Sequence, residues 1–277
     1  MATDTFTPGQ WFHGRIFEKR CDLSPDGTLL IYFAQKIDGR TKWDEGTHNW
    51  TAISRLPYLT ALALWMYGYG GGGGGLFSSN TDVRLNQSGQ AAEPHPDHLP
   101  RGLNIDTRSF ANEDAHLSQR LIRDGWQHTQ KLQGEAIESP WGKAYWERKR
   151  TGLPTDFDWH RTVDHLSTTS RYIFLTPGID EKPNSDRSLT LVMKTTTRNG
   201  YSRRYTYFVR DAEGLEEPLT GAEWADWDYR GRLVFARDGK IFALPPDGVG
   251  RAEPQELANL NDHKPEPMVA PDWAKVW

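Results

Sequence analysis

Hydrophobic and polar residues alternate over short runs, and the clearest example lies between residues 221 and 245. Two β-rich runs, Arg232–Arg237 and Lys240–Leu244, are separated only by the dipeptide Asp238-Gly239. A two-residue hairpin needs positive φ at both central positions, which Asp and Gly tolerate better than most residues. This stretch therefore predicts two antiparallel strands that are joined by a tight turn.

A second copy of this pattern lies near the N-terminus, in Cys21–Gln35. Each copy has an Asp, an apolar residue, a turn that contains Gly and then a β-rich run, and aligning the copies pairs Asp22 with Asp226. The interval between the copies divides into four units of about 51 residues or five of about 41, close to the length of a propeller blade. The chain is therefore expected to be a series of such units.

Further short strands are expected along the chain, with turn residues such as Asn199-Gly200 between them. The expected strands are Trp11–Lys19, Thr28–Lys36, Trp50–Arg55, Asp82–Asn86, Ile122–Lys131, Arg171–Thr176, Ser188–Thr196 and Ser202–Arg210. Pro57–Tyr67 fits either a short helix or a strand, and a strand is preferred because its neighbours are β. Ser109–Leu121 has helical character, and Gly142–Arg150 fits a short helix or an exposed turn.

These patterns indicate an all-β protein, and sandwiches, barrels and propellers all fit short strands with regular turns. The motif LSPDG at Leu23–Gly27, with the β-rich run after it, resembles the repeats of TolB-type and WD-like propellers. In those families the motif forms the turn into the third strand of a blade. The resemblance implies a β-propeller or a propeller-like array of about five to six antiparallel blades, some of them incomplete.

The whole chain also resembles an uncharacterised family of bacterial proteins that end in a KPEP…APDWA-type segment, here Lys264–Ala274. That likeness implies no particular activity. The expected organisation is a flexible N-terminal arm over residues 1–10 and one propeller-like domain over residues 11–277. Within the domain, residues 87–120 are expected to be a loop excursion, and residues 246–277 an extended Pro-rich tail that packs on the domain.

Composition narrows the class of protein. The net charge is −4, so no basic excess points to nucleic acid. The N-terminus shows no signal peptide, and the longest apolar stretch, Leu59–Tyr67, is too short to cross a bilayer, so we expect a cytoplasmic protein without membrane contact. The single cysteine, Cys21, excludes an intrachain disulfide and is expected to be a small core residue.

The sequence lacks several common catalytic motifs. The six glycines Gly70–Gly75 are not followed by Gly-Lys-Ser/Thr, so they do not form a P-loop, and close backbone approach is the better explanation. No nucleophile elbow is present, and no HExxH motif accompanies His95/His98 or His160/His165. Paired carboxylates such as Asp156/Asp158 and Asp226/Asp228 occur where turns favour Asp, and hydrogen bonds to turn amides explain Asp22 and Asp226. We therefore expect no cofactor and no metal.

The tryptophans are the remaining signal, with Trp224 and Trp227 on either side of Asp226. Packing between blades explains such residues, but Trp is also enriched at protein-binding surfaces, and Trp126, Trp224 and Trp227 are the candidate binding residues. The expected function is a non-catalytic binding or scaffolding module that acts on another protein. The alternative is a hydrolase or lyase that acts on a carbohydrate or small ester at the propeller mouth.

Overall fold

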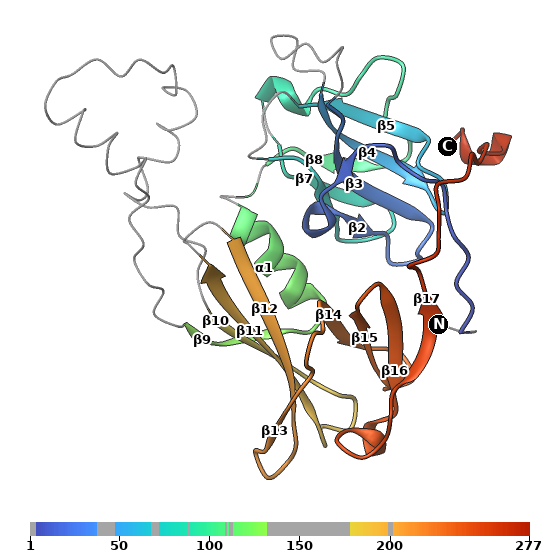
Figure 1. Ribbon diagram of the computed structural model, residues 1–277. Coiled ribbons are helices and arrows are strands. Elements are labelled where there is room, and N and C mark those ends of the chain that lie inside the picture. The colour runs from blue at the N-terminus through green and yellow to red at the C-terminus, as the bar shows by residue number, and fades with distance from the viewer. Residues whose placement is uncertain are drawn as a thin grey trace, which may run out of the picture. The chain divides into compact units, whose positions relative to one another are not determined.

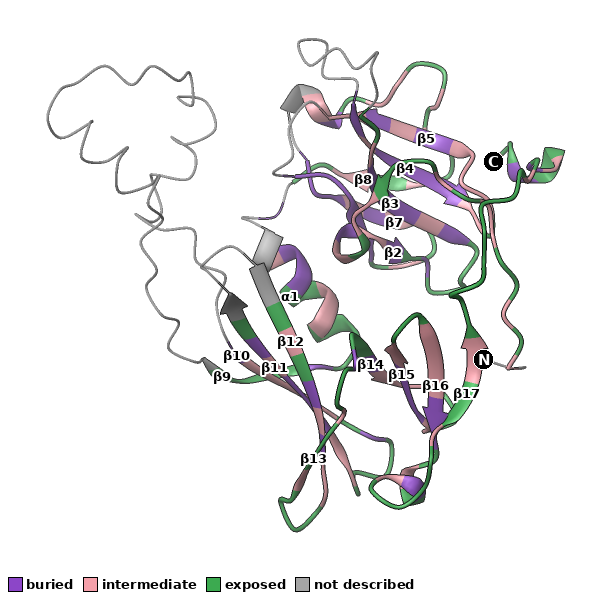
Figure 2. Cartoon of the chain, viewed as in Figure 1, coloured by how far each residue is buried: buried purple, intermediate pink, exposed green. Residues whose placement is uncertain are grey.

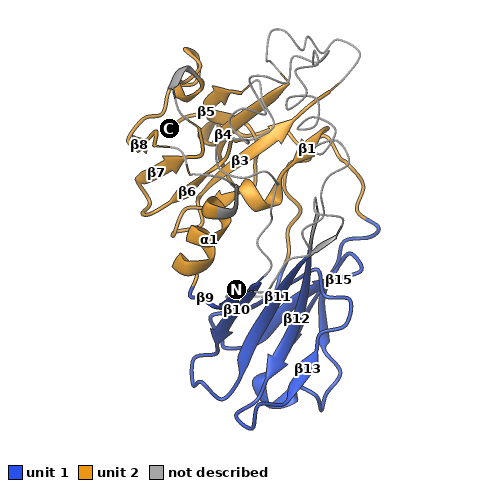
Figure 3. Ribbon diagram, turned by 90° about the vertical axis from the view of Figure 1, so that its left-hand side faces the viewer, with its two compact units in different colours: residues 1–5, 125–262 blue, residues 6–124, 263–277 orange. Residues whose placement is uncertain are grey.

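The computed structural model describes residues 4–37, 48–67, 72–87, 89–108, 110, 113–131, 178–198 and 202–277. Over these residues the chain is mostly β and forms four sheets, in which every strand pairing is antiparallel except that of β7 with β8 (Figure 1). The expectation of a β-rich fold is confirmed. The described residues divide into two compact units, with unit 1 formed by residues 1–5 and 125–262 and unit 2 by residues 6–124 and 263–277 (Figure 3).

Unit 2 contains two of the sheets and the long helix α1 (Glu113–Arg123). Its larger sheet has the order β1-β3-β4-β5, and β2 pairs with β3. Its smaller sheet has the order β6-β7-β8. The strands are β1 (Arg15–Ile16), β2 (Asp22–Leu23), β3 (Leu29–Gln35), β4 (Asn49–Arg55), β5 (Ala61–Met66), β6 (Gly75–Phe77), β7 (Asp82–Leu85) and β8 (Asn104–Asp106).

The core of unit 2 is built on β3 and β4, which are mostly buried along their whole length (Figure 2). Side chains of both faces of β3 are buried, as its apolar sequence predicts, because the strand has neighbours above and below. One cluster contains Ile31, Ile53, Trp65, Phe77 and Leu85, and the partly buried Trp277 packs against it. The strand interpretation of Pro57–Tyr67 is confirmed over β5.

Unit 1 contains the other two sheets, with orders β13-β12-β11-β10-β9 and β14-β15-β16-β17. The strands are β9 (Gln127–Lys131), β10 (Gly178–Pro183), β11 (Thr190–Arg198), β12 (Ser202–Arg210), β13 (Glu216–Pro218), β14 (Trp224–Trp227), β15 (Leu233–Arg237), β16 (Lys240–Leu244) and β17 (Gln255–Asn259). The predicted hairpin is confirmed, since β15 pairs with β16 and Asp238 and Gly239 have φ of 52° and 70°.

One turn geometry recurs between paired strands that follow one another in the chain: β2 and β3, β10 and β11, β12 and β13, and β14 and β15. In each copy the first residue of the turn accepts, through its side-chain oxygen, a hydrogen bond from an amide at the start of the following strand or one residue before it. The pairs are Ser24 with Leu29, Asn184 with Leu189, Asp211 with Leu215 and Asp228 with Arg232. The side chains of Ser, Asn and Asp can all accept this hydrogen bond. The four turns therefore share a hydrogen-bond geometry although their first residues differ.

Several segments differ in detail from their sequence-based expectation. The span expected as a loop, residues 87–120, contains the 3-10 helix Gly89–Ala92, strand β8 and most of α1, whose helical character was expected. The span expected as a Pro-rich tail contributes β17, which pairs with β16, and the 3-10 helices Pro246–Gly248 and Asp272–Ala274. The first expected strand, Trp11–Lys19, is a strand only over β1, and its last two residues lie in the 3-10 helix Glu18–Arg20.

The expected elements Arg171–Thr176, Gly142–Arg150 and the turn Asn199-Gly200 lie outside the described residues. The organisation of residues 11–277 as one domain stays a prediction. Among the described residues, α1 and the shorter helices lack the length and apolar character that crossing a bilayer requires.

Candidate functional site

The three candidate tryptophans all lie in unit 1, in different environments. Trp224, at the start of β14, is 48% exposed. Trp227, at the end of the same strand, is partly buried, and its indole N–H donates to the carbonyl oxygen of Lys182 at 2.9 Å. Trp126 precedes β9 and is buried. Packing thus accounts for Trp126 and part of Trp227, whereas Trp224 offers its ring to solvent.

A row of charged side chains lies beside Trp227 on strand β10. Lys182 Nζ is 2.6 Å from Asp226 Oδ1, and both side chains are largely buried. Two residues earlier on β10, Asp180 Oδ1 is 3.2 Å from His128 Nδ1. Residues two apart on a strand share a face, so the structure places His128, Asp180, Lys182 and Asp226 in sequence along one side of β10. Only Asp226 was singled out from the sequence.

The His128–Asp180 pair has features of an oriented imidazole. Asp180 is the residue opposite His128 in the β9–β10 register, and burial raises its pKa despite the opposing effect of His128. Gly178 leaves room for the ring, because a Cβ there would lie 2.5 Å from His128 Cε1. The His128 side chain is half exposed, so the pair can exchange a proton with a molecule at the surface.

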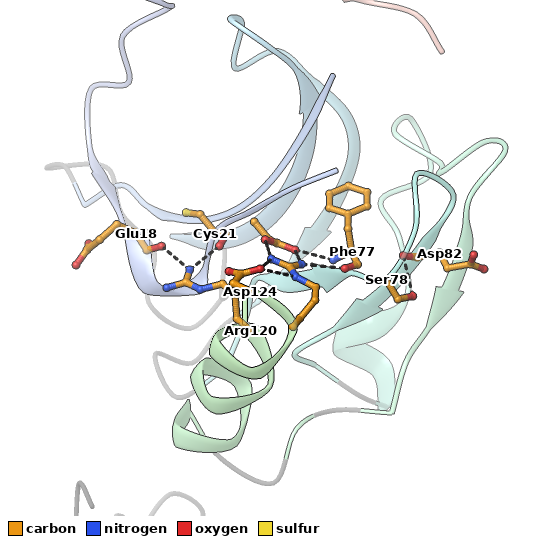
Figure 4. A network of polar contacts seen from close by, with 9 residues as sticks. Glu18, Cys21, Phe77, Ser78, Asp82, Arg120 and Asp124 are labelled. Carbon is orange, nitrogen blue, oxygen red and sulfur yellow. Dashed lines mark hydrogen bonds and ion pairs between the residues drawn. The ribbon is translucent and has the colours of Figure 1, made fainter. Parts of the chain in front are cut away.

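A second polar centre lies in unit 2, where the end of α1 with Arg120 and Asp124 meets Cys21 and Phe77 (Figure 4). Arg123, the last residue of α1, donates through Nη1 and Nη2 to the two Asp22 oxygens at 2.5 and 2.8 Å. Asp22 Oδ2 also accepts the Phe77 amide at 2.8 Å, and Arg123 Nη1 donates to the Phe77 carbonyl at 2.9 Å. The Asp22 side chain is only 5% exposed, and its hydrogen bonds raise the pKa of Arg123.

The structure gives Asp22 and Asp226 partners other than the turn amides that were expected for them. Asp22 is used by Arg123 and by a neighbouring strand, while Asp226 pairs with Lys182 and accepts the amide of Trp227 at 2.7 Å. The turn amides are satisfied instead by Ser24 and Asp228, which follow two residues later. Both aspartates lie on the strand before the turn, and their carboxylates form ion pairs with residues of other elements.

The described part of the glycine run has a structural explanation. Gly73 and Gly74 have φ of 92° and 76°, in the left-handed region that favours glycine. A Cβ on Gly73 would lie 2.1 Å from the Phe33 ring, and one on Gly74 would lie 2.0 Å from the Arg20 carbonyl oxygen. Close backbone approach, rather than phosphate binding, therefore accounts for these two positions.

The remaining sequence candidates give no further site. Cys21 is partly buried, and desolvation raises its pKa to about 11, so the thiol stays protonated near neutral pH. The rings of His95 and His98 are tilted by 47° with their centroids 5.8 Å apart, whereas His160, His165, Asp156 and Asp158 lie outside the described residues. Within the part of the chain that the structure describes, three or more His, Cys, Asp or Glu side chains do not gather as metal ligands would.

Comparison with known proteins finds no match to a family model. No curated protein matches the chain. No solved structure matches it either.

Proposed function

We propose that the protein is a non-catalytic binding module that contacts another protein through unit 1. The observation that carries this proposal is the exposed ring of Trp224 at the start of β14, in a strand whose other tryptophan is fixed by a hydrogen bond to Lys182. Exposed Trp beside a rigid strand is typical of binding hot spots, because its large ring loses little conformational freedom on binding.

The charged groups agree with a binding role. Asp22 is buried and Asp226 is partly buried, and each carboxylate is neutralised by a basic side chain in an ion pair that links separate elements of the fold. Glu216 is likewise bonded to Lys194 and Arg210, which lower its pKa. These pairs hold strands together rather than activate a nucleophile.

We further propose that the sheets are blades of a propeller-like array. The recurring turn and the polar contacts between neighbouring sheets within each unit support this arrangement, since strands of adjacent blades approach each other around a common axis. In unit 2 the amide of β6 reaches Asp22 on β2, and in unit 1 Lys182 on β10 reaches Asp226 on β14. A crystal structure in which these four strands do not surround one axis would contradict the proposal.

The binding function is tested by quantitative capture from the native host with tagged wild-type protein, Trp224→Ala and Trp273→Ala. Trp273 is a matched control, because it is 56% exposed and lies in unit 2. We expect a near-stoichiometric protein whose recovery falls at least about tenfold with Trp224→Ala and stays unchanged with Trp273→Ala. Equal recovery with both variants, or elution of the wild type alone, would refute the proposal.

A second candidate is a hydrolase or lyase for a carbohydrate or small ester, and the His128–Asp180 pair favours it. A half-exposed imidazole that is oriented by a largely buried carboxylate is suited to general acid–base catalysis. Purified protein would be screened with nitrophenyl esters and glycosides. Turnover that His128→Gln abolishes, and that Lys240→Gln leaves intact, would support this candidate over the binding module.

A further inference from the structure

In the turn after β14, the guanidinium group of Arg232 lies between two carboxylates, those of Asp228 and Asp4, which differ in burial. On its inner side, Arg232 Nε and Nη2 each lie 2.9 Å from Asp228 Oδ2. The Asp228 side chain is 8% exposed, and its Oδ1 also accepts the amides of Arg230 and Arg232 at 2.9 Å. Asp228 is therefore an integral part of the turn and fixes the orientation of the guanidinium group.

On its outer side, the same guanidinium group binds Asp4, which lies near the start of the sequence. Arg232 Nη1 donates to Asp4 Oδ2 at 3.0 Å, and Nη2 donates to Oδ1 at 2.8 Å, a bidentate geometry. Arg230 Nη1 lies 3.6 Å from Asp4 Oδ1 and adds a second positive charge. These contacts lower the pKa of Asp4.

The two carboxylates differ in how readily they can leave. Asp228 is buried within the turn, whereas Asp4 belongs to a chain segment outside the sheet, and its side chain is more exposed than those of Arg232 and Asp228. A solvent-accessible ion pair adds little stability and is weakened by salt. Departure of Asp4 would leave Arg232 still oriented by Asp228, with its outer donors directed at solvent. Such pre-organisation lowers the cost of binding a new carboxylate.

We propose that Arg232 and Arg230 form a binding site for an acidic segment of a partner protein, and that Asp4 is its internal occupant. The proposal deepens the binding function above and rests on it only for the assumption that the natural ligand is a protein. Tyr229 adjoins the site, is 67% exposed and accepts a hydrogen bond from Arg230 Nε at 3.0 Å. Arg beside exposed Tyr is the composition that protein-binding surfaces favour.

In this proposal, the Asp4 carboxylate competes with the acidic segment of the partner for Arg232 and Arg230. A tethered carboxylate acts at a high effective concentration, so it suppresses weak acidic ligands and yields to a segment that makes several contacts. Removing the carboxylate from position 4 therefore strengthens binding in trans, and removing the arginine weakens it. A purely structural ion pair would give no gain of binding with either change.

The test measures binding of a fluorescein-labelled hexa-aspartate peptide to purified protein by fluorescence anisotropy at low salt. We expect Asp4→Asn to tighten binding about threefold or more, and Arg232→Gln to weaken it about tenfold. Arg230→Gln, which leaves the Arg232–Asp228 pair in place, is expected to weaken binding by a smaller factor. Lys240→Gln is the matched control, because Lys240 also pairs with a carboxylate, Glu256, at the surface of unit 1.

Three results would overturn the proposal. The first is the absence of hexa-aspartate binding by Asp4→Asn, and the second is a response of Lys240→Gln equal to that of Arg232→Gln. The third is a concentration-dependent dimer that Asp4→Asn abolishes, which would assign the site to the arm of a second copy. The assay uses purified protein, so its outcome is independent of whether capture through Trp224 identifies a partner.

Discussion

Asp22 and Asp226 occupy the same place in two copies of one sequence pattern, yet the two units neutralise them differently. In unit 2, Asp22 is 5% exposed and receives the two-pronged guanidinium of Arg123 and a strand amide. In unit 1, Asp226 is 22% exposed and receives the single ammonium group of Lys182. The deeper carboxylate has the partner that satisfies more of its oxygen lone pairs.

This difference shows which properties the repeat fixes. The pattern fixes an Asp on a short strand and a turn that follows this strand, and both copies keep these features. The counter-ion comes from outside the pattern, from α1 in one unit and from β10 in the other. A repeat can therefore keep its backbone while its buried charge is satisfied by an unrelated part of the chain.

The largest expected effect follows from removing the arginine of the deeper pair. Arg123→Ala leaves the Asp22 carboxylate buried without its cation, and we expect the free energy of unfolding to fall by about 3–5 kcal/mol. Urea denaturation followed by circular dichroism measures the change. Arg108→Ala is the control, because Arg108 is 85% exposed and also pairs with an aspartate, Asp106, so its loss should have a much smaller effect than that of Arg123. Equal losses would show that the depth of Asp22 is irrelevant.

The next largest effect is expected where the backbone at Gly74 lies close to the carbonyl group of Arg20, beside the strand that carries Asp22. Gly74→Ala places a methyl group against the Arg20 carbonyl at a positive φ, and we expect a loss of about 2–4 kcal/mol. Gly27→Ala is matched in φ, at 72°, but a Cβ there meets nothing within 4 Å, so strain alone should cost about 1–2 kcal/mol. Thermal unfolding of the two variants separates crowding from strain, and identical shifts would contradict the crowding argument.

A smaller loss is expected when the shallower pair is broken. Lys182→Met keeps the aliphatic stem but leaves Asp226 without its cation, and we expect a loss of about 1–2 kcal/mol because water reaches this carboxylate. The measurement is again urea denaturation, with Lys240→Met as the exposed counterpart. A loss as large as that of Arg123→Ala would remove the distinction between the two pairs.

The smallest expected effect concerns pH. The folded protein holds a proton on Asp180 more tightly than the unfolded chain does, because burial raises its pKa. Its contribution to stability is therefore present at acidic pH and declines as pH rises from about 3.8 through the folded value. Asp180→Asn should flatten this decline in urea midpoints measured across the acidic to neutral range.

Asp186 supplies a control of opposite sign. Hydrogen bonds from Ser188 lower its pKa, so its contribution is present at higher pH and is lost as pH falls through the folded value. Asp186→Asn should therefore reduce stability at neutral pH relative to acidic pH. The same direction of change in both variants would contradict the opposite pKa shifts on which the prediction rests.

Much of the β structure was readable from local sequence. The Asp238-Gly239 hairpin, the two-sided burial of β3 and the β11–β12 pairing follow from turn chemistry and alternation, which act within a few residues. Strand β17 was not predicted, because its sequence is polar and prolines lie on both sides of it. It is a strand because it pairs with β16, and that pairing is not visible in the local sequence. The number of blades and the propeller itself stay predictions.

The candidate site was less predictable. Trp224 and Trp227 stood out by composition, but His128, Asp180 and Lys182 come together only because β9 and β10 pair across residues far apart in sequence. The contact of Asp4 with Arg232 also spans almost the whole chain. A local signal did exist for the turn, since Asp228-x-x-Gly-Arg repeats the Ser24-to-Leu29 geometry with a different first residue.

The division of the chain between the units has a consequence for protein synthesis. Unit 2 takes residues 6–124 and then residues 263–277, so the ribosome completes the whole of unit 1 before the last part of unit 2 emerges. Until then, the Phe77 and Leu85 cluster lacks the Trp277 ring that packs against it, and Leu99 lacks its indole hydrogen bond. Most of unit 2 is thus synthesised before unit 1, yet its core receives the Trp277 ring only after the last residue of unit 1 has been added.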